Sequence, residues 1–194
     1  MRRRTFLLCS GAAAGLAACT SPNPSLYTMA AVPGRSLPGG PRIVVLHQVA
    51  VARYLERPEI VRSSEDYRLD VLSNDVWGEP IAQMIGRVLS EDLTQRLPGT
   101  TVISSNGAIS APENATVEVN IQRMDKDRSG ALVFDAQAAV EFTKPSRGEV
   151  TRSLRTSVPI ASPATADEVR ATSIALGQLA DLIADMLRRP GAAR

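Results

Sequence analysis

Hydrophobic and polar residues alternate in two long segments of the second half of the chain. The segment from Ala115 to Asp125 has apolar residues at every second position as far as Ile121, and the alternation returns from Leu132 to Phe142 after a polar turn at Lys126 to Gly130. A period of two is typical of strands with one face on a core and the other in water. The two segments are therefore predicted to form a β-hairpin, with the mostly polar segment Glu149 to Ile160 as a further strand.

Two other segments have a helical period. From Pro80 to Leu97, apolar residues recur every three or four positions, and Pro98-Gly99 ends the pattern. A second apolar face follows Thr165 and continues to about Arg189. Glu168 stands three residues after Thr165, which predicts a capping box at the start of this helix.

Shorter apolar and β-branched runs predict the remaining strands of the domain. The order of strands and helices predicts an α+β fold, with a mostly antiparallel β-sheet and two amphipathic helices packed on one face. We expect a single domain over residues 42–189 and a flexible tail over 190–194. The remaining predicted strands are Arg42 to Tyr54, Glu59 to Ser63, Tyr67 to Leu72 and Thr101 to Ser105.

The N-terminus has the features of an export signal over residues 1–18. Three arginines precede an apolar stretch from Phe6 to Leu16, which is shorter than the ~20 residues that span a bilayer. Leu16-Ala17-Ala18-Cys19 then matches a lipobox, so Cys19 is predicted to be the first mature residue and to carry lipid, including palmitate. The alternative is an ordinary signal with a chance cysteine. The adjacent Arg3 and Arg4 are compatible with export by the twin-arginine route or by the general route, and both routes remain open.

The residues after Cys19 predict where the domain is held. Thr20, rather than an aspartate, follows the cysteine, which favours sorting to the periplasmic face of the outer membrane. Residues 19–41 are rich in Pro, Gly and Ser and are predicted to form a tether containing one short strand, Leu26 to Val32.

Charge and composition exclude several kinds of site. The chain of 194 residues has 22 Lys and Arg against 20 Asp and Glu, and removing the three signal arginines leaves 19 − 20 = −1. A nearly neutral domain gives no reason to expect nucleic-acid binding. Cys9 would be removed, Cys19 would be acylated and His47 is the single histidine, so we expect no metal and no cofactor. Without a nucleophile beside a base, we expect no enzyme.

Two motifs point to a known family. The first is Tyr-Leu-Glu-Arg-Pro-Glu-Ile-Val at 54–61, and the second is Trp-Gly-Glu-Pro-Ile at 77–81, followed by Leu89, Leu93 and Leu97-Pro98. At this spacing after a lipobox, the chain resembles the PqiC/YmbA-type ABC-transport auxiliary lipoproteins over roughly residues 19–187. In the second half it matches by pattern rather than by motif.

The resemblance implies a non-catalytic auxiliary subunit of an ABC/MCE-type system that moves lipid between the two membranes. The lipoprotein would dock the MCE-domain protein that forms the conduit from the inner membrane. A homo-oligomer is implied, because some members of the family form oligomers. A different class remains open: a periplasmic scaffold or regulator lipoprotein for envelope assembly, in cell-wall synthesis or outer-membrane protein insertion.

The same motifs supply the candidate contacts with a partner or with lipid: Tyr54, Leu55, Arg57, Pro58 and Trp77. Proline breaks the strand there, and an indole can bind apolar chains while keeping a polar N–H. In the alternative interpretation the loop is a bend packed on its own domain, with Arg57 paired to a nearby acid. Trp77 would then be a staple at the start of the helix.

Overall fold

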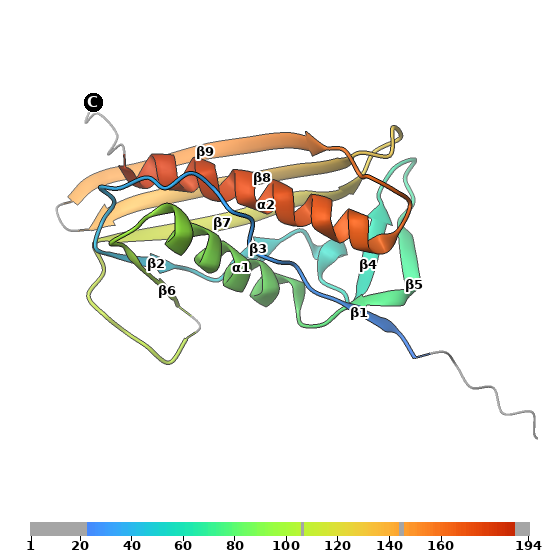
Figure 1. The fold of residues 1–194 in the computed structure, drawn as a ribbon, viewed down its shortest axis with the longest axis horizontal. Helices are drawn as coiled ribbons and strands as arrows, with labels where there is room; N and C mark the ends of the chain where they lie inside the picture. Colours follow the sequence, from blue (N-terminus) through green and yellow to red (C-terminus); the bar gives the residue numbers. More distant parts are fainter. Residues whose placement is uncertain (1–22, 106, 144–145, 189–194) are drawn as a thin grey trace, which may run out of the picture.

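The computed structural model describes residues 23–105, 107–143 and 146–188. The predicted signal, Cys19 and the predicted tail over 190–194 lie outside these residues. Within the described ranges, nine strands form one sheet, and two helices lie across one face of it (Figure 1). The predicted α+β fold with both helices on one face is confirmed.

The long antiparallel part of the sheet consists of three strands. They are β7 (Ala115–Lys126), β8 (Leu132–Thr143) and β9 (Ser146–Val158). Val117 pairs with Val140, and Ala136 with Leu154, so apolar side chains share the face beneath the helices. The predicted hairpin is present within a residue of its expected limits at each end.

The other edge of β7 pairs with three short strands in succession, all parallel to it. They are β2 (Ile43–Leu46), β3 (Ala50–Val51) and β4 (Glu59–Ser63). The prediction of one continuous strand from Arg42 to Tyr54 is therefore wrong. Leu46 pairs with Val117 and Ala50 with Asn120, so four steps along one chain match three along the other. The extra residue must leave the ladder, and the strand breaks there.

Both ends of the sheet add further strands. At one end β6 (Thr101–Ser104) pairs in parallel with β2. At the other end β5 (Asp70–Trp77) runs antiparallel to β4, and β1 (Ser25–Tyr27) runs parallel to β5. The sheet is thus mixed, with its longest ladders antiparallel.

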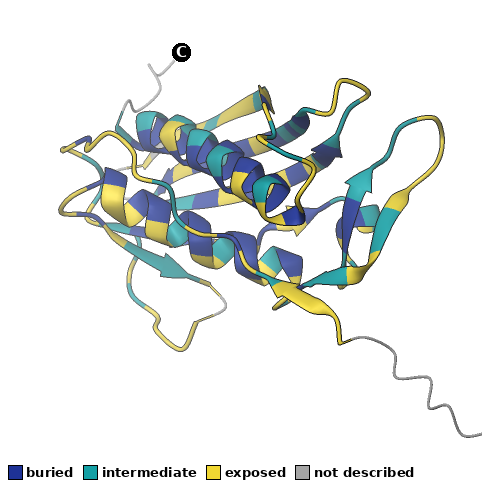
Figure 2. Ribbon diagram, turned by 45° about the vertical axis from the view of Figure 1, so that its right-hand side comes forward, coloured by how far each residue is buried: buried dark blue, intermediate teal, exposed yellow. Residues whose placement is uncertain are grey.

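The helices are α1 (Ile81–Arg96) and α2 (Thr165–Arg188). Their apolar faces meet the inner face of the sheet, where buried residues form one continuous core (Figure 2). The predicted capping box is absent at the start of α2. The Thr165 hydroxyl instead donates to Asp75 at 2.5 Å, and the Glu168 carboxylate lies 3.0 Å from the Lys126 ammonium. Tertiary partners thus occupy both groups that a capping box would use locally.

Residues 28–41 cross the two helices in an extended conformation, and we call this segment the strap. Its side chains Met29 and Leu37 are buried, and the Leu37 amide donates to the Arg96 carbonyl at 2.6 Å. The sequence predicts a tether over residues 19–41 with a strand from Leu26 to Val32, but the strand ends at Tyr27 because only β1 (Ser25–Tyr27) pairs with β5. In the structure, the chain from Ser25 onward packs on the domain.

A buried arginine fixes the strap. Arg96 is 1% exposed, and its Nη1 lies 3.0 Å from the Val32 carbonyl and 3.1 Å from Asp92 Oδ1. Its Nε lies 2.7 Å from Asp181 Oδ1, and its Nη2 lies 3.0 Å from the Gly177 carbonyl. Asp92 also accepts the Val32 amide at 2.9 Å. Burial raises the pKa of Asp92, whereas the Val32 amide and the Arg96 guanidinium oppose that rise.

Glycine is required where the strap passes this cation. A Cβ atom on Gly34 would lie 2.3 Å from Arg96 Cζ, and one on Gly177 would lie 3.2 Å from the Val32 side chain. The absence of side chains at these two positions lets the strap and α2 approach the guanidinium.

Arg96→Ala is expected to destabilise the domain by about 3–5 kcal/mol, because Asp92 is left as a buried charge without its cation. Arg87→Ala is the matched control. Arg87 also lies on α1, contacts two acids and the strap, but its side chain is 41% exposed, so the expected loss is below about 1 kcal/mol. Denaturant unfolding measures both values, and equal losses would contradict the proposed role of burial.

The loss caused by Arg96→Ala is expected to depend on pH. Without the guanidinium the pKa of Asp92 rises further, and the folded state is penalised only when Asp92 is ionised. The stability deficit should therefore shrink as the pH falls through the raised pKa and grow as the pH rises.

Gly34→Ala is expected to lower stability by about 1–3 kcal/mol, because the pinned guanidinium has no room to move away from the added methyl. Trypsin cleavage after the exposed Arg35 should become faster as the strap loosens. Ser36→Ala, at an exposed position of the same strap, should leave both the stability and the cleavage rate unchanged.

Candidate functional site

The two sequence motifs, 54–61 and 77–81, meet in the structure. The Trp77 amide donates to the Pro58 carbonyl at 2.8 Å, and the amide of the next residue donates to the Tyr27 carbonyl at the same distance. β1 pairs with β5 through Tyr27 and Trp77, so three segments join within a few residues. We call this place the motif junction. It connects the N-terminal strand, the end of the sheet and the start of α1.

The candidate contact residues divide into buried and accessible ones. Leu55 is 3% exposed and Trp77 is 9% exposed, so both pack in the domain's own core. Arg57 pairs with Glu59 at 3.2 Å. These positions fit the alternative interpretation, a packed bend and a staple. Pro58 is exposed, and Tyr54 and Arg57 are partly exposed.

Tyr54 connects the motif junction to a buried acid. It belongs to a short 3-10 turn, η1 (Arg53–Leu55), and its hydroxyl donates to Asp125 Oδ2 at 2.7 Å. Asp125 is fully buried near the end of β7. Burial and the neighbouring carboxylate raise the pKa of Tyr54 well above its ordinary value, so the hydroxyl stays protonated and remains a donor.

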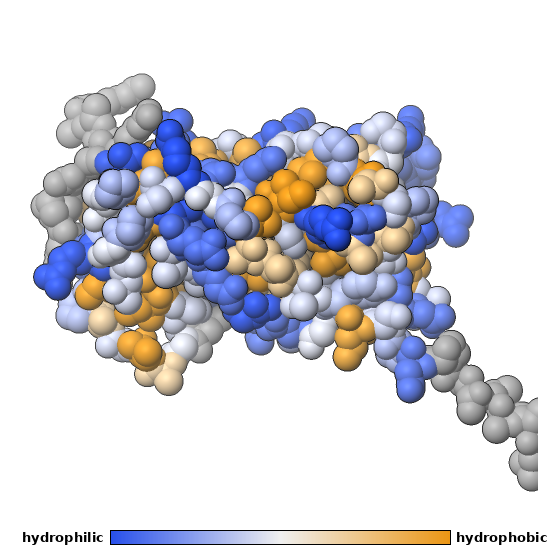
Figure 3. All heavy atoms as spheres, in the orientation of Figure 1, coloured by the Kyte–Doolittle hydropathy of each residue, from blue (hydrophilic) through white to orange (hydrophobic). Residues whose placement is uncertain are grey.

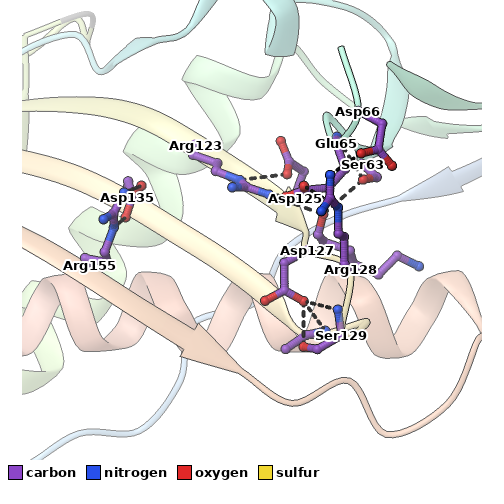
Figure 4. A network of polar contacts seen from close by, with 12 residues as sticks. Ser63, Glu65, Asp66, Arg123, Asp125, Asp127, Arg128, Ser129, Asp135 and Arg155 are labelled. Atoms are coloured by element: carbon purple, nitrogen blue, oxygen red, sulfur yellow. Dashed lines mark hydrogen bonds and ion pairs between the residues drawn. The ribbon is translucent and has the colours of Figure 1, made fainter. Parts of the chain in front are cut away.

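Asp125 belongs to a larger polar network that ties two hairpins together (Figure 4). Arg123 Nε lies 3.0 Å from Asp125 Oδ1, and Arg123 Nη2 lies 2.7 Å from Glu65 Oε1. Arg128, in the turn after β7, pairs with Glu65 and Asp66 in the turn after β4. The network thus holds the β4–β5 and β7–β8 turns side by side.

A second buried acid lies beneath this network. Glu168 is 3% exposed, with Lys126 at 3.0 Å and Arg62 at 3.9 Å from its Oε2. Burial raises the pKa of Glu168, whereas Lys126 opposes that rise. No sequence pattern indicates this contact, because Lys126 and Glu168 lie 42 positions apart in the chain, on a strand and a helix.

The chemistry available here is that of fixed ion pairs. Asp125, Glu65, Asp66 and Glu168 each lie against a cation or a hydroxyl donor. In the parts of the chain that the structure describes, no group of three or more His, Cys, Asp or Glu is placed to hold a metal ion. Within the same parts, no helix is long and apolar enough to cross a membrane. His47 is exposed just after β2, and its amide donates to the Val117 carbonyl.

Tyr54→Phe is expected to destabilise the domain by about 1–3 kcal/mol, because the buried carboxylate of Asp125 loses a hydrogen-bond donor. Tyr27→Phe is the control, since the Tyr27 hydroxyl has no bond to any described residue. The control should change the unfolding free energy by less than about 0.5 kcal/mol. Equal effects of the two substitutions would show that the Tyr54 hydroxyl is not a structural donor.

Solved structures share this fold. The crystal structure of an uncharacterized protein superposes with a TM-score of 0.69 at 18% identity, covering 84% of this chain and 97% of the other. Protein XCC0632 from Xanthomonas campestris superposes with a TM-score of 0.59 at 16% identity, covering 84% and 95%. At such identities the likeness shows the fold alone. No curated protein matches the chain.

The family is shown by the sequence itself. A family model described as the ABC-type transport auxiliary lipoprotein component matches residues 27–184, which include the strap, the motif junction, the whole sheet from β2 to β9 and nearly all of α2. The chain belongs to the family of ABC-type transport auxiliary lipoproteins.

Proposed function

We propose that this chain is a non-catalytic auxiliary subunit of an ABC/MCE-type system that moves lipid between the inner and outer membranes. Lipid on Cys19 anchors it to the outer membrane, and the folded domain faces the periplasm. There it docks the MCE-domain protein of the inner membrane. The observation that carries the proposal is the family match over 27–184, which begins eight residues after a lipobox cysteine.

The non-catalytic role is supported by the state of the acids in the polar network. Their carboxylates are bonded to arginine, lysine or tyrosine side chains that hold strands and turns together. A general acid or base needs a free proton position next to a substrate. These acids instead stabilise the end of the sheet.

The motif junction supports docking through its outer rim rather than through its core. Tyr54, Arg57 and Pro58 keep accessible surface beside the start of β4, and Leu55 and Trp77 support them from within. A rigid, partly polar rim of this kind suits a protein partner. In a homo-oligomer, each copy of the chain would present this rim to the partner.

Cys19→Ala is expected to abolish labelling of the chain by a palmitate analogue, because the variant lacks the sulfur that takes the lipid. It should also leave the signal over residues 1–18 uncleaved by lipoprotein peptidase. The measurement is metabolic labelling, with the size of the chain compared on a gel. Labelling that persists in the variant would refute the lipid anchor.

The docking step is tested by co-isolation. Cross-linked wild-type chain should retrieve an MCE-domain protein, and Arg57→Glu combined with Pro58→Asp should reduce that yield without changing the melting temperature. Retrieval of cell-wall synthases or outer-membrane insertion machinery in its place would favour the scaffold function. Leu55→Ala does not serve as a control here, because it disturbs the core.

A further inference from the structure

Exposed apolar side chains gather at one end of the molecule. Among the described residues, four large hydrophobic side chains are exposed: Leu26, Tyr67, Leu69 and Ile109. Three of them lie on β1 or on the β4–β5 turn, at the end where the chain enters the domain (Figure 1). Ile109 lies on the loop after β6, at the opposite end. Figure 3 shows a small apolar spot near β1, whereas the larger apolar areas lie over the middle of the helix-bearing face.

The β4–β5 turn, residues 64–69, has an unusual backbone. Asp66 has φ 57° and Tyr67 has φ 61°, both in the left-handed region. Aspartate tolerates this conformation, but a bulky aromatic residue rarely adopts it. Tyr67 is 110% exposed, so it gains no packing within its own domain. Neither the backbone nor the core therefore accounts for a tyrosine here, and strain of this kind is typical of functional positions.

The turn is rigidly held. Arg123 binds Glu65 from β7, and Arg128 binds both Glu65 and Asp66 from the neighbouring turn (Figure 4). These ion pairs connect the β4–β5 and β7–β8 hairpins, so the turn that carries the exposed Tyr67 is held by its neighbours.

An arginine lies between Tyr67 and Leu69 in the sequence of the turn. Arg68 is exposed, and its guanidinium has no hydrogen bond or ion pair with any residue that the structure describes. Tyrosine, leucine and arginine together suit the boundary of a bilayer. The aromatic ring lies at headgroup level, the aliphatic chain reaches the acyl region and the guanidinium binds phosphate.

Chain geometry places this end near a membrane. Ser25 pairs with Asp75, and β5 begins at Asp70 directly after the turn, so the entering chain and the turn lie at the same end of the sheet. In Figure 2 both lie on the right-hand side of the molecule, the β4–β5 turn above and the entering chain below. Five residues lie between Cys19 and Ser25, so six residue steps, at most about 20 Å, separate the two. A lipid on Cys19 therefore keeps Ser25, where the chain enters the domain, within that distance of the bilayer.

We propose that Tyr67, Leu69 and Arg68 form a second membrane contact, which inserts into the headgroup region of the membrane that holds the lipid anchor. A single short linker leaves the tilt of the domain relative to the bilayer free. The second contact fixes that tilt. This inference rests on the proposed lipid anchor at Cys19.

Single-cysteine labelling tests the contact. Tyr67→Cys in the full, lipidated chain is labelled with an environment-sensitive fluorophore and reconstituted in phosphatidylethanolamine–phosphatidylglycerol vesicles that carry a headgroup quencher. Ile109→Cys is the matched control, an exposed apolar position at the other end. Wild-type chain, whose Cys19 is acylated, is the unlabelled blank. Leu69→Cys provides a second position in the turn.

We expect a blue shift and loss of fluorescence at positions 67 and 69, and no change at 109. Vesicle-bound chain with the label at 67 still in water would overturn the membrane contact and leave the anchor intact. Quenching at 109 equal to that at 67 would overturn it as well, because the domain would then lie flat. If the chain stays in solution, or if the wild-type chain takes up label, Cys19 is not acylated. Either result overturns the lipid anchor and the proposed function with it.

Discussion

The guanidinium of Arg96, buried between the two helices, binds the strap at Val32, α1 at Asp92, and α2 at Gly177 and Asp181. A charge out of water is tolerated only when every donor has a partner, so these segments must be in place together. The network therefore makes the N-terminal strap part of the fold. Where the strap is fixed, the position at which the chain enters the domain is fixed too.

The motif junction depends on that arrangement. Because the strap begins directly after β1, Tyr27 lies beside Trp77, and Trp77 in turn bonds to Pro58. The residues by which the family is recognised thus join the entering chain to the sheet and to α1. In the proposed function, the subunit is fixed to one membrane and docks a conduit that comes from the other membrane. It therefore sets where the conduit lies relative to the membrane that holds the anchor. A rigid link between the anchor and the docking rim suits that role.

Sequence patterns predicted the elements that rest on local periodicity. β7, β8 and both helices appear close to their expected limits, because alternation and the helical period follow from burying one face of each element. The strand predicted from Arg42 to Tyr54 failed because its break depends on register with β7. Among the candidate contacts, hydrophobicity did not distinguish a surface patch from a core residue, and Trp77 and Leu55 are buried.

By itself the sequence determined the α+β class and the two family motifs, and it predicted a lipid anchor at Cys19, because these depend on neighbours along the chain. Only the tertiary structure decided that the Pro- and Gly-rich segment after the anchor is a packed strap. It also explained why α1 carries a buried Asp92, whose carboxylate binds Arg96 and the Val32 amide. The physical reason is that a buried charge and a packed strap are both stabilised by partners that are distant in sequence, and only folding brings them together.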